Sequence, residues 1–323
     1  MFARHTAFLL GFFFLTQVAT AKGSVGRFKP ILKFEDIHYS HISIVKSVTG
    51  IWRMGDNLFT TGKTPNFFIT PINTPPKGYD PLLDIAPSEK IVIPTADPTH
   101  EWLPMGELVE DKVMLFNKNN LKIYLFNKKD WSVIETKDLV VDQLKPAKDA
   151  RGEPTKKETG ALQTKLRLFY NKTKDDLALI KSIASLPVDK REKDAHQFVA
   201  LTSFPDHPVV TMTCSAKLPL YCKLERACFT RLPAGVALKD LQGISFSEKR
   251  HTLFIGNTTE HRLEAFTYNS CFDVVHSGKM DYSVKLKRLQ ALHIDHTDGL
   301  WFATAEPDDY RNGSVYFWLA KDW

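Results

Sequence analysis

Beyond its first 21 residues, the sequence lacks any apolar run long enough to span a membrane, and it lacks the motifs of the common enzyme classes. A membrane-crossing helix needs about 20 consecutive apolar residues. The G-x-S-x-G, H-E-x-x-H, P-loop and dinucleotide-binding patterns are all missing. These absences argue against a membrane channel, and they leave mainly those enzyme classes whose catalytic residues come from scattered loops.

The composition lacks the biases of fibrous or disordered proteins. Of the 323 residues, 43% are hydrophobic and 25% are charged, which is typical of a globular chain with a sizeable core. The formal net charge of +6 is modest, and no nucleic-acid-binding motif is present, so we expect no nucleic-acid partner.

The first 21 residues are typical of a signal peptide. Arg4 and His5 form a short basic start, residues 7–15 are apolar, and Ala19 and Ala21 give an A-x-A cleavage pattern before Lys22. We therefore expect a secreted or periplasmic protein without a transmembrane segment. Residues 22–323 would form a single domain.

Cysteine is scarce and confined to the last third of the chain, at Cys214, Cys222, Cys228 and Cys271. An even number of cysteines in an exported protein predicts two disulfides, with the pairing open among three connectivities. The loop at 218–221 makes a bridge among the first three plausible, with the remaining one bonded to Cys271. The spacing contains no C-x-x-C pair, so zinc is the less favoured alternative.

Short strands dominate the pattern. Residues 113–116 and 121–126 flank a turn-rich gap and predict a hairpin, and the second run alternates with a period of two. Residues 131–136 predict a third strand. Three consecutive strands joined by tight turns make a meander.

A strand–turn–strand–loop–strand unit recurs in the C-terminal part of the chain. It occupies 241–266 and again 289–318, with Gln290 lying 48 residues after Gln242, and a fainter copy begins at 198. Units of 40 to 50 residues are typical of propeller blades, because radial stacking covers both apolar faces of each small sheet. We therefore predict an all-β fold, a β-propeller of six blades, with residues 37–62 as the first blade.

Two segments interrupt this pattern. Residues 65–104 contain 9 of the 18 prolines, which predicts an irregular, proline-rich excursion, since proline cannot donate to a central ladder. Residues 145–160 are dense in charged side chains and predict an exposed insertion.

The densest group of potential ligands lies at 293–298. On a strand, His293 and Asp295 would share one face, so they are candidates for a catalytic acid/base pair. One strand supplies few converging ligands, so a solvent-facing strand and turn is the favoured alternative, and we expect no metal site. Trp52 and Arg53 are candidates for binding a glycan or peptide.

Residues 240–246, followed by 249–255, resemble the blade-opening motif of exported six-bladed propellers of the SdiA-regulated and esterase-like phytase group, and more distantly gluconolactonase and NHL-repeat propellers. The resemblance covers residues 197–323. It implies a residue facing the central channel at Gln242 and at the matching Gln290. The family commonly has a cation-binding Glu where Gln242 stands, so these neutral amides are candidate binding residues rather than metal ligands.

The sequence thus favours an exported, non-enzymatic binding protein whose partner is a protein or a glycan, with no cofactor. The alternative is a cation-dependent hydrolase, of the lactonase or phosphoesterase type, that uses Ca²⁺ and channel-lining residues such as His293. The two differ in whether several carboxylates or imidazoles converge at one end of the channel.

Overall fold

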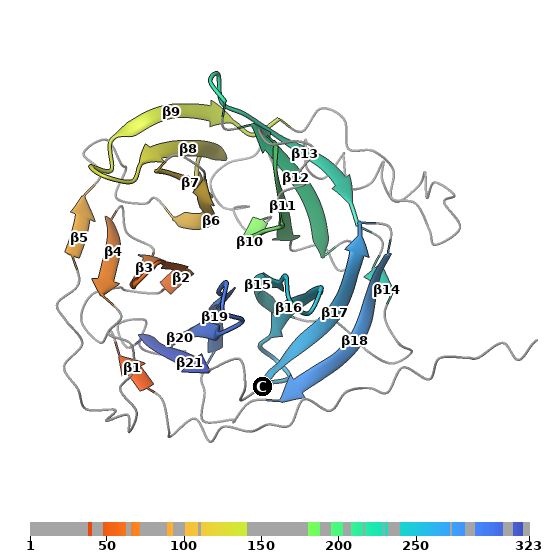
Figure 1. Ribbon diagram of the computed structural model, residues 1–323. Helices are drawn as coiled ribbons and strands as arrows, with labels where there is room; N and C mark the ends of the chain where they lie inside the picture. Colours follow the sequence, from red (N-terminus) through yellow and green to blue (C-terminus); the bar gives the residue numbers. More distant parts are fainter. Residues whose placement is uncertain are drawn as a thin grey trace, which may run out of the picture.

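The computed structural model describes residues 38–40, 48–62, 66–71, 89–92, 101–108, 111–140, 180–187, 195–202, 208–215, 217–228, 230–231, 240–271, 273–281, 288–305 and 313–318. Within these ranges the secondary structure is entirely β, and none of it forms a helix that could cross a bilayer. The strands form small sheets around a ring (Figure 1). The predicted signal peptide at 1–21 and the charged insertion at 145–160 lie outside the described residues.

Five sheets, here called blades 1 to 5, follow one another along the described chain. Blade 1 comprises β2 (Val48–Met54), β3 (Asn57–Gly62), β4 (Asn66–Pro71) and β5 (Glu89–Val92). Blade 2 comprises β6 (Trp102–Leu108), β7 (Lys112–Asn117), β8 (Lys122–Asn127) and β9 (Val133–Asp138). Blade 3 comprises β10 (Ile180–Ser185), β11 (Ala195–Thr202), β12 (Val209–Ser215) and β13 (Tyr221–Ala227). Blade 4 comprises β15 (Leu241–Ser247), β16 (Thr252–Asn257), β17 (Arg262–Ser270) and β18 (Asp273–Asp281), with β14 (Thr230–Arg231) added parallel to β18.

Blade 5 combines the two ends of the described chain. Its first three strands are β19 (Arg288–Ile294), β20 (Leu300–Ala305) and β21 (Gly313–Trp318). The fourth is β1 (His38–Ser40), which pairs antiparallel with β21. The N-terminal strand therefore completes the last blade instead of opening the first, contrary to the expected blade at 37–62, and its pairing holds the ring closed.

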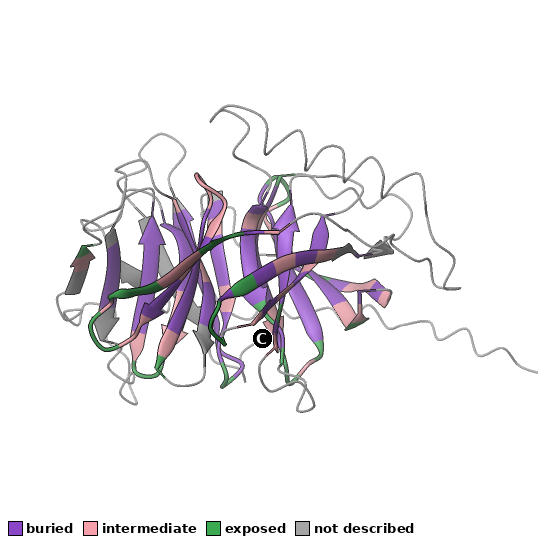
Figure 2. Ribbon diagram, turned by 90° about the horizontal axis from the view of Figure 1, so that it is seen from above, coloured by how far each residue is buried: buried purple, intermediate pink, exposed green. Residues whose placement is uncertain are grey.

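Each junction between neighbouring blades, here called a seam, has its own hydrophobic cluster. The seam between blades 5 and 1, for example, buries Val48, Ile51 and Phe68 against Ala291 and Trp301. The other four clusters fill the seams between blades 1 and 2, 2 and 3, 3 and 4, and 4 and 5. Figure 2 shows buried residues through the body of the blades, with exposed ones gathered at turns and on outer strands.

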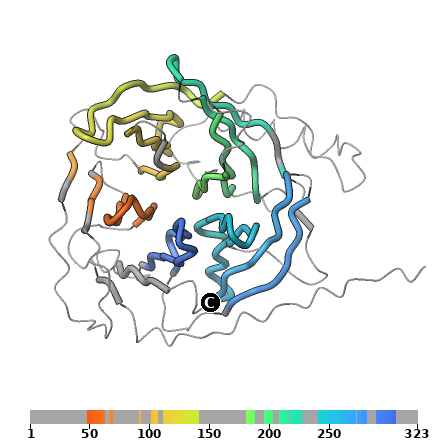
Figure 3. The backbone as a smooth tube through the Cα atoms, in the orientation of Figure 1, coloured from red at the N-terminus to blue at the C-terminus, as the bar shows by residue number. Residues whose placement is uncertain are grey.

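The predicted β-propeller fold is confirmed, but the described part of the chain contains five blades rather than the six predicted. The inner strands β2, β6, β10, β15 and β19 surround the centre (Figure 3), and β19 packs against β2, so the ring closes at five. Six is the number of blades obtained when the chain length is divided by the repeat of 40 to 50 residues. Segments such as 72–88 and 141–179 add length without adding a described strand, which makes that division an overestimate.

The local strand predictions agree well with the blades. The hairpin and third strand predicted at 113–136 are β7, β8 and β9, and the repeated units starting at 241 and 289 are blades 4 and 5. The fainter copy beginning at 198 is shifted by one strand, because it starts on β11, the second strand of blade 3.

The proline-rich stretch 65–104 contains β4, β5 and the start of β6, so it is not wholly irregular. Two of its prolines show how strands tolerate them. Pro71 is the last residue of β4, and Pro104 directly precedes a register shift in β6. Both positions limit the loss of ladder hydrogen bonds.

The inner strand of every described blade contains a β-bulge or similar irregularity. Bulges bend a strand and strengthen its twist, and they leave backbone groups without a ladder partner. Hydroxyl groups of neighbouring inner strands also form hydrogen bonds with backbone groups of these strands. Ser182 Oγ accepts a hydrogen bond from the backbone N–H of Ile244 at 3.1 Å, and Thr49 Oγ1 donates to the carbonyl of Trp102 at 3.0 Å. The seams are therefore joined by polar links as well as by apolar contacts.

Two disulfides are present, one of each predicted kind. Cys214 and Cys222 are opposed residues of β12 and β13, with Cα atoms 4.1 Å apart. Cys228, just after blade 3, is bonded to Cys271 in the turn between β17 and β18, with Cα atoms 4.5 Å apart. The first disulfide lies within one sheet, whereas the second joins two blades.

We expect the inter-blade disulfide to contribute more stability than the disulfide within blade 3. The chain-entropy model gives about 4 kcal/mol for the 43-residue separation and about 2.5 kcal/mol for the 8-residue separation. All four cysteines are buried, so the paired substitutions Cys228→Ala with Cys271→Ala, and Cys214→Ala with Cys222→Ala, remove similar apolar volume. Urea unfolding should give the lower midpoint for the first pair; equal midpoints would contradict the expectation.

We also expect Gly243→Ala to destabilise the protein more than Gly55→Ala. Both glycines have positive φ, +69° and +58°, so both substitutions strain the backbone by about 1–2 kcal/mol. A Cβ at Gly243 would also lie 2.9 Å from the Cβ of Leu292 on the next blade, whereas a Cβ at Gly55 meets nothing within 4 Å. The difference between the two unfolding free energies measures the inter-blade clash, and a difference near zero would refute it.

Candidate functional site

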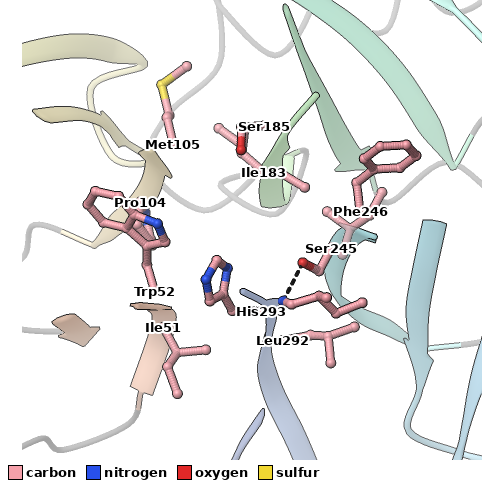
Figure 4. A pocket seen from close by; sticks show the side chains of 13 residues that line it. Ile51, Trp52, Pro104, Met105, Ile183, Ser185, Ser245, Phe246, Leu292 and His293 are labelled. Atoms are coloured by element: carbon pink, nitrogen blue, oxygen red, sulfur yellow. Dashed lines mark hydrogen bonds between the residues drawn. The ribbon is translucent and has the colours of Figure 1, made fainter. Parts of the chain in front are cut away.

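The centre of the ring is almost filled by side chains. A void of about 30 Å³ remains, lined by residues from the inner strands of all five blades. That volume suits about one water molecule. In Figure 4 the rings of Trp52 and His293 point into this central space, and Ser245 Oγ accepts a hydrogen bond from the backbone N–H of Ile294 at 2.7 Å. The channel is therefore a packed core rather than a pore.

A larger cavity of about 360 Å³, here called the mouth cavity, lies at one end of this channel. The two share lining residues, among them Trp52, Phe246 and His293. The mouth cavity is also lined by Arg53, Asp295 and other polar side chains. Its volume falls within the range of small-molecule sites.

Asp295 lies directly after β19, and its carboxylate accepts five hydrogen bonds. Oδ1 accepts from the backbone and hydroxyl groups of Thr297, at 2.8 and 2.5 Å, and from the backbone N–H of Gly299 at 3.0 Å. Oδ2 accepts from Arg53 Nη1 at 2.8 Å and from Trp301 Nε1 at 2.9 Å. The side chain is 1% exposed. This carboxylate is fully engaged, so no lone pair is left for a metal ion or for proton transfer.

The hydrogen bonds also set the charge state of Asp295. Burial alone would raise the pKa of this carboxyl, but the bonds from Thr297, Trp301, Arg53 and Gly299 lower it to about 2. Because Arg53 belongs to blade 1 and Asp295 to blade 5, the ion pair crosses the seam that closes the ring.

The same turn makes a second ion pair on its other side. Asp298 accepts hydrogen bonds from Ser247 Oγ at 2.5 Å and from Arg250 Nε at 2.6 Å, and both partners belong to blade 4 or to the turn that follows β15. The turn at 295–299 therefore connects blade 5 to blades 1 and 4. The favoured expectation of a solvent-facing turn is wrong for these two aspartates, since both are buried and paired.

His293 keeps its ring accessible from the cavity. Burial lowers its pKa to about 4; the negative charge of Asp295 opposes this effect, and the charges of Arg53 and His296 add to it. The imidazole is therefore neutral at pH 7. Among the described residues it makes no hydrogen bond, so one donor and one acceptor remain for a ligand.

The structure brings together four of the six candidate residues. Trp52, Arg53, His293 and Asp295 all line the mouth cavity, although residues 53 and 295 are 242 positions apart in sequence.

Gln242 and Gln290 line neither cavity. The ladder shifts register next to Gln242 and at Gln290, and both side chains are partly exposed.

Sequence reasoning missed several residues of the mouth cavity. Phe246 ends the predicted strand 241–246, and its period-two pattern does not distinguish a channel-facing ring from a seam-facing one. Ser185, Glu248 and Lys249 lie at strand ends or in turns, where no periodic signal exists. His296 belongs to the group of potential ligands at 293–298 but was not singled out as a site residue. The one signal that could have identified these residues is their position at the end of an inner strand or just after it.

A second charged cluster lies inside blade 4, away from both cavities. Glu264 is fully buried and is hydrogen-bonded by Arg262 Nε, by His276 Nε2 at 2.7 Å and by Asn257 Nδ2 at 3.2 Å. Burial alone would raise the pKa of Glu264, but these partners hold it below its usual value. The hydrogen bonds of this cluster stabilise the buried negative charge of Glu264.

No group of three or more His, Cys, Asp or Glu side chains within the described ranges is placed to hold a metal ion.

No protein-family model matches the chain, and no curated protein resembles it in sequence. Among solved structures, it is similar to glutaminyl cyclase from Myxococcus xanthus, with 5% identity and a TM-score of 0.46 over 87% of this chain and 94% of that one. It is also similar to virginiamycin B lyase from Staphylococcus aureus, with 11% identity and a TM-score of 0.43 over 87% of each chain. A third is the calcium-binding protein regucalcin from Agrobacterium tumefaciens, with 8% identity and a TM-score of 0.39 over 84% and 75%.

Similarities at this level carry no argument about activity. The resemblance to the SdiA-regulated and esterase-like phytase group therefore stays a prediction.

We expect the paired state of Asp295 to stabilise the fold above about pH 4. Its pKa falls from 3.8 to about 2, so ionisation contributes about 2 kcal/mol. Because the folded pKa is the lower one, this contribution is present above the unfolded pKa and is lost as the pH falls towards 2. Urea midpoints measured from pH 7 to pH 2 should show it.

The control variant Asp56→Asn removes an exposed carboxylate from the neighbouring turn and should keep the wild-type profile. Asp295→Asn should be less stable at pH 7 by about 3 kcal/mol, because an amide cannot accept all five bonds, and its profile should be flatter below pH 4. An unchanged profile in Asp295→Asn would show that another group is responsible.

Proposed function

We propose that the protein is an exported, non-enzymatic binding protein, and that its ligand occupies the mouth cavity. One observation carries this proposal: the buried carboxylates of the cavity are already hydrogen-bonded, while the aromatic and imidazole rings remain accessible. Such a site offers contact area and hydrogen bonds to a ligand, while its buried carboxylates are not free to act as an acid or a base. The signal-peptide pattern and the two disulfides support export.

The accessible rings come from different blades. Trp52 belongs to β2, Phe246 to β15 and His293 to β19, and all three line both the channel void and the mouth cavity. Aromatic rings held by a rigid scaffold give a large contact area at a small cost in conformational entropy. A sugar ring or a single side chain of a protein partner is the size of group that fits about 360 Å³.

The alternative, a cation-dependent hydrolase, has less support. Such an enzyme needs several oxygen or nitrogen ligands that converge on the cation. Asp295 and Asp298 are occupied by hydrogen bonds from the protein. The freer groups of the cavity are then the exposed Glu248 and His296 and the neutral His293.

We expect Trp52→Ala to weaken ligand binding about tenfold or more, because it removes one wall of the cavity. The ligand panel is a set of neutral monosaccharides and blocked single amino acids, screened by saturation-transfer NMR and then titrated by tryptophan fluorescence or calorimetry. Tyr221→Ala removes a half-exposed aromatic ring that lies on blade 3 outside the cavity, and should have no effect.

Two results would contradict the proposal. One is a panel without any hit, or hits that Trp52→Ala leaves unchanged. The other is release of product from lactone or phosphate-ester substrates on addition of Ca²⁺, with loss of that activity in His293→Ala; that result would establish the hydrolase.

A further inference from the structure

Two of the three guanidinium nitrogens of Arg53 are held by the protein. Its guanidinium carries five N–H donors. Nε donates to the carbonyl of Gly55 at 3.0 Å, and one N–H of Nη1 donates to Asp295. Three donors are left without an acceptor among the described residues, and the side chain is 21% exposed where it lines the mouth cavity. Asp295 thus fixes the group in place, while the unpaired N–H groups of Nη1 and Nη2 stay available to a ligand in the cavity that Arg53 lines.

The rest of the lining adds further unengaged donors. Lys249 is exposed and lines the same cavity, and the neutral imidazole of His293 has one N–H available. The acceptors Asp295 and Asp298 are already saturated or paired. Only Glu248, which is exposed beside Lys249, adds an unengaged negative charge among the described lining residues. The free donors of the lining are therefore complemented by a ligand group that accepts hydrogen bonds.

The apolar lining restricts the rest of the ligand. Trp52, Phe246 and Pro187 come from different blades or their connections and border the same space. A compact ring or apolar body can contact these surfaces while its charged group reaches Arg53. The planar fork of an arginine matches the two oxygens of a carboxylate, and charge-assisted bonds of this kind are about twice as strong as neutral ones.

We propose that the mouth cavity binds a small carboxylic acid, with the carboxylate on the unpaired Nη donors of Arg53 and a ring-containing body between Trp52 and Phe246. This inference rests on the proposed binding function and names its ligand class. The carboxylate can belong to a sugar acid or to a free amino-acid terminus.

The test compares acids with uncharged counterparts of the same shape. The probes are glucuronate against glucuronamide, and N-acetyl-phenylalanine against its amide, titrated by calorimetry at low and at physiological salt. At least one acid should bind about tenfold more tightly than its amide, with an affinity that falls as salt rises. The pair that shows the difference identifies the source of the carboxylate.

Variants then locate the contact. Arg53→Lys keeps the charge opposite Asp295 but loses the fork, so it should weaken acid binding about fivefold and leave amide binding unchanged. Lys249→Gln should weaken acid binding about threefold, and Glu248→Gln should strengthen it by a similar factor, because both act through a single nearby charge. Lys129→Gln removes a charge that is 77% exposed, outside the cavity, and should have no effect.

The outcomes separate the two proposals. If acid and amide bind equally and Trp52→Ala weakens both, the binding function stands and carboxylate recognition is refuted. Recognition is also refuted if Arg53→Lys and Lys249→Gln both bind the acid as the wild type does, or if inorganic phosphate displaces the acids at lower concentration than they bind. If neither acids nor amides bind, both proposals fail.

Discussion

The buried carboxylate of Asp295 is the interaction on which closure of the ring and the shape of the cavity both depend. A propeller needs a final seam between its first and last blades, and here Arg53 of blade 1 reaches Asp295 of blade 5 across it. The ion pair works together with the pairing of β1 and β21 and with the apolar cluster around Trp301. Trp301 contributes twice, since its ring packs in that cluster and its indole N–H donates to Asp295. Chain closure and site geometry are thus fixed by the same few atoms.

The remaining seams show how one architecture is joined by different chemistry. Threonine hydroxyls link blades 1 and 2, a serine hydroxyl and a disulfide link blades 3 and 4, and another serine links blades 4 and 5. Blades 2 and 3 are joined further out, where Val140 pairs with β13 and Glu135 accepts from the backbone of Leu220. Each link satisfies a backbone or side-chain group that packing alone would leave unpaired.

Local periodicity was sufficient to find individual strands, and it failed where distant residues decide the structure. The alternation at 121–126 predicted β8, where Ile123 and Leu125 are buried on one face while Lys122 and Tyr124 are partly exposed on the other. The repeat near 241 and 289 gave the blade architecture. The blade count could not follow from length, because β1 pairs with a strand 274 to 278 residues later (Ser40 with Ser314, His38 with Tyr316) and because connecting segments vary in length. Five blades also place fewer inner strands around the channel, which suits a centre closed by side chains.

The candidate site, too, was predictable in its residue types but not in its contacts. Residue type marked His293 and Asp295 as a possible acid/base pair, and Trp52 and Arg53 as binding groups, and the fold brings all four to one cavity. The hydrogen-bond partners of these residues could not be predicted from the sequence. The donors to Asp295, for example, come from blade 1, from the following turn and from β20.

That saturation limits what the site can do. To serve as a base or as a metal ligand, Asp295 would have to release Arg53, and this release would weaken the seam that closes the ring. A mouth built on such a carboxylate is therefore suited to recognition through the groups that the ion pair leaves exposed.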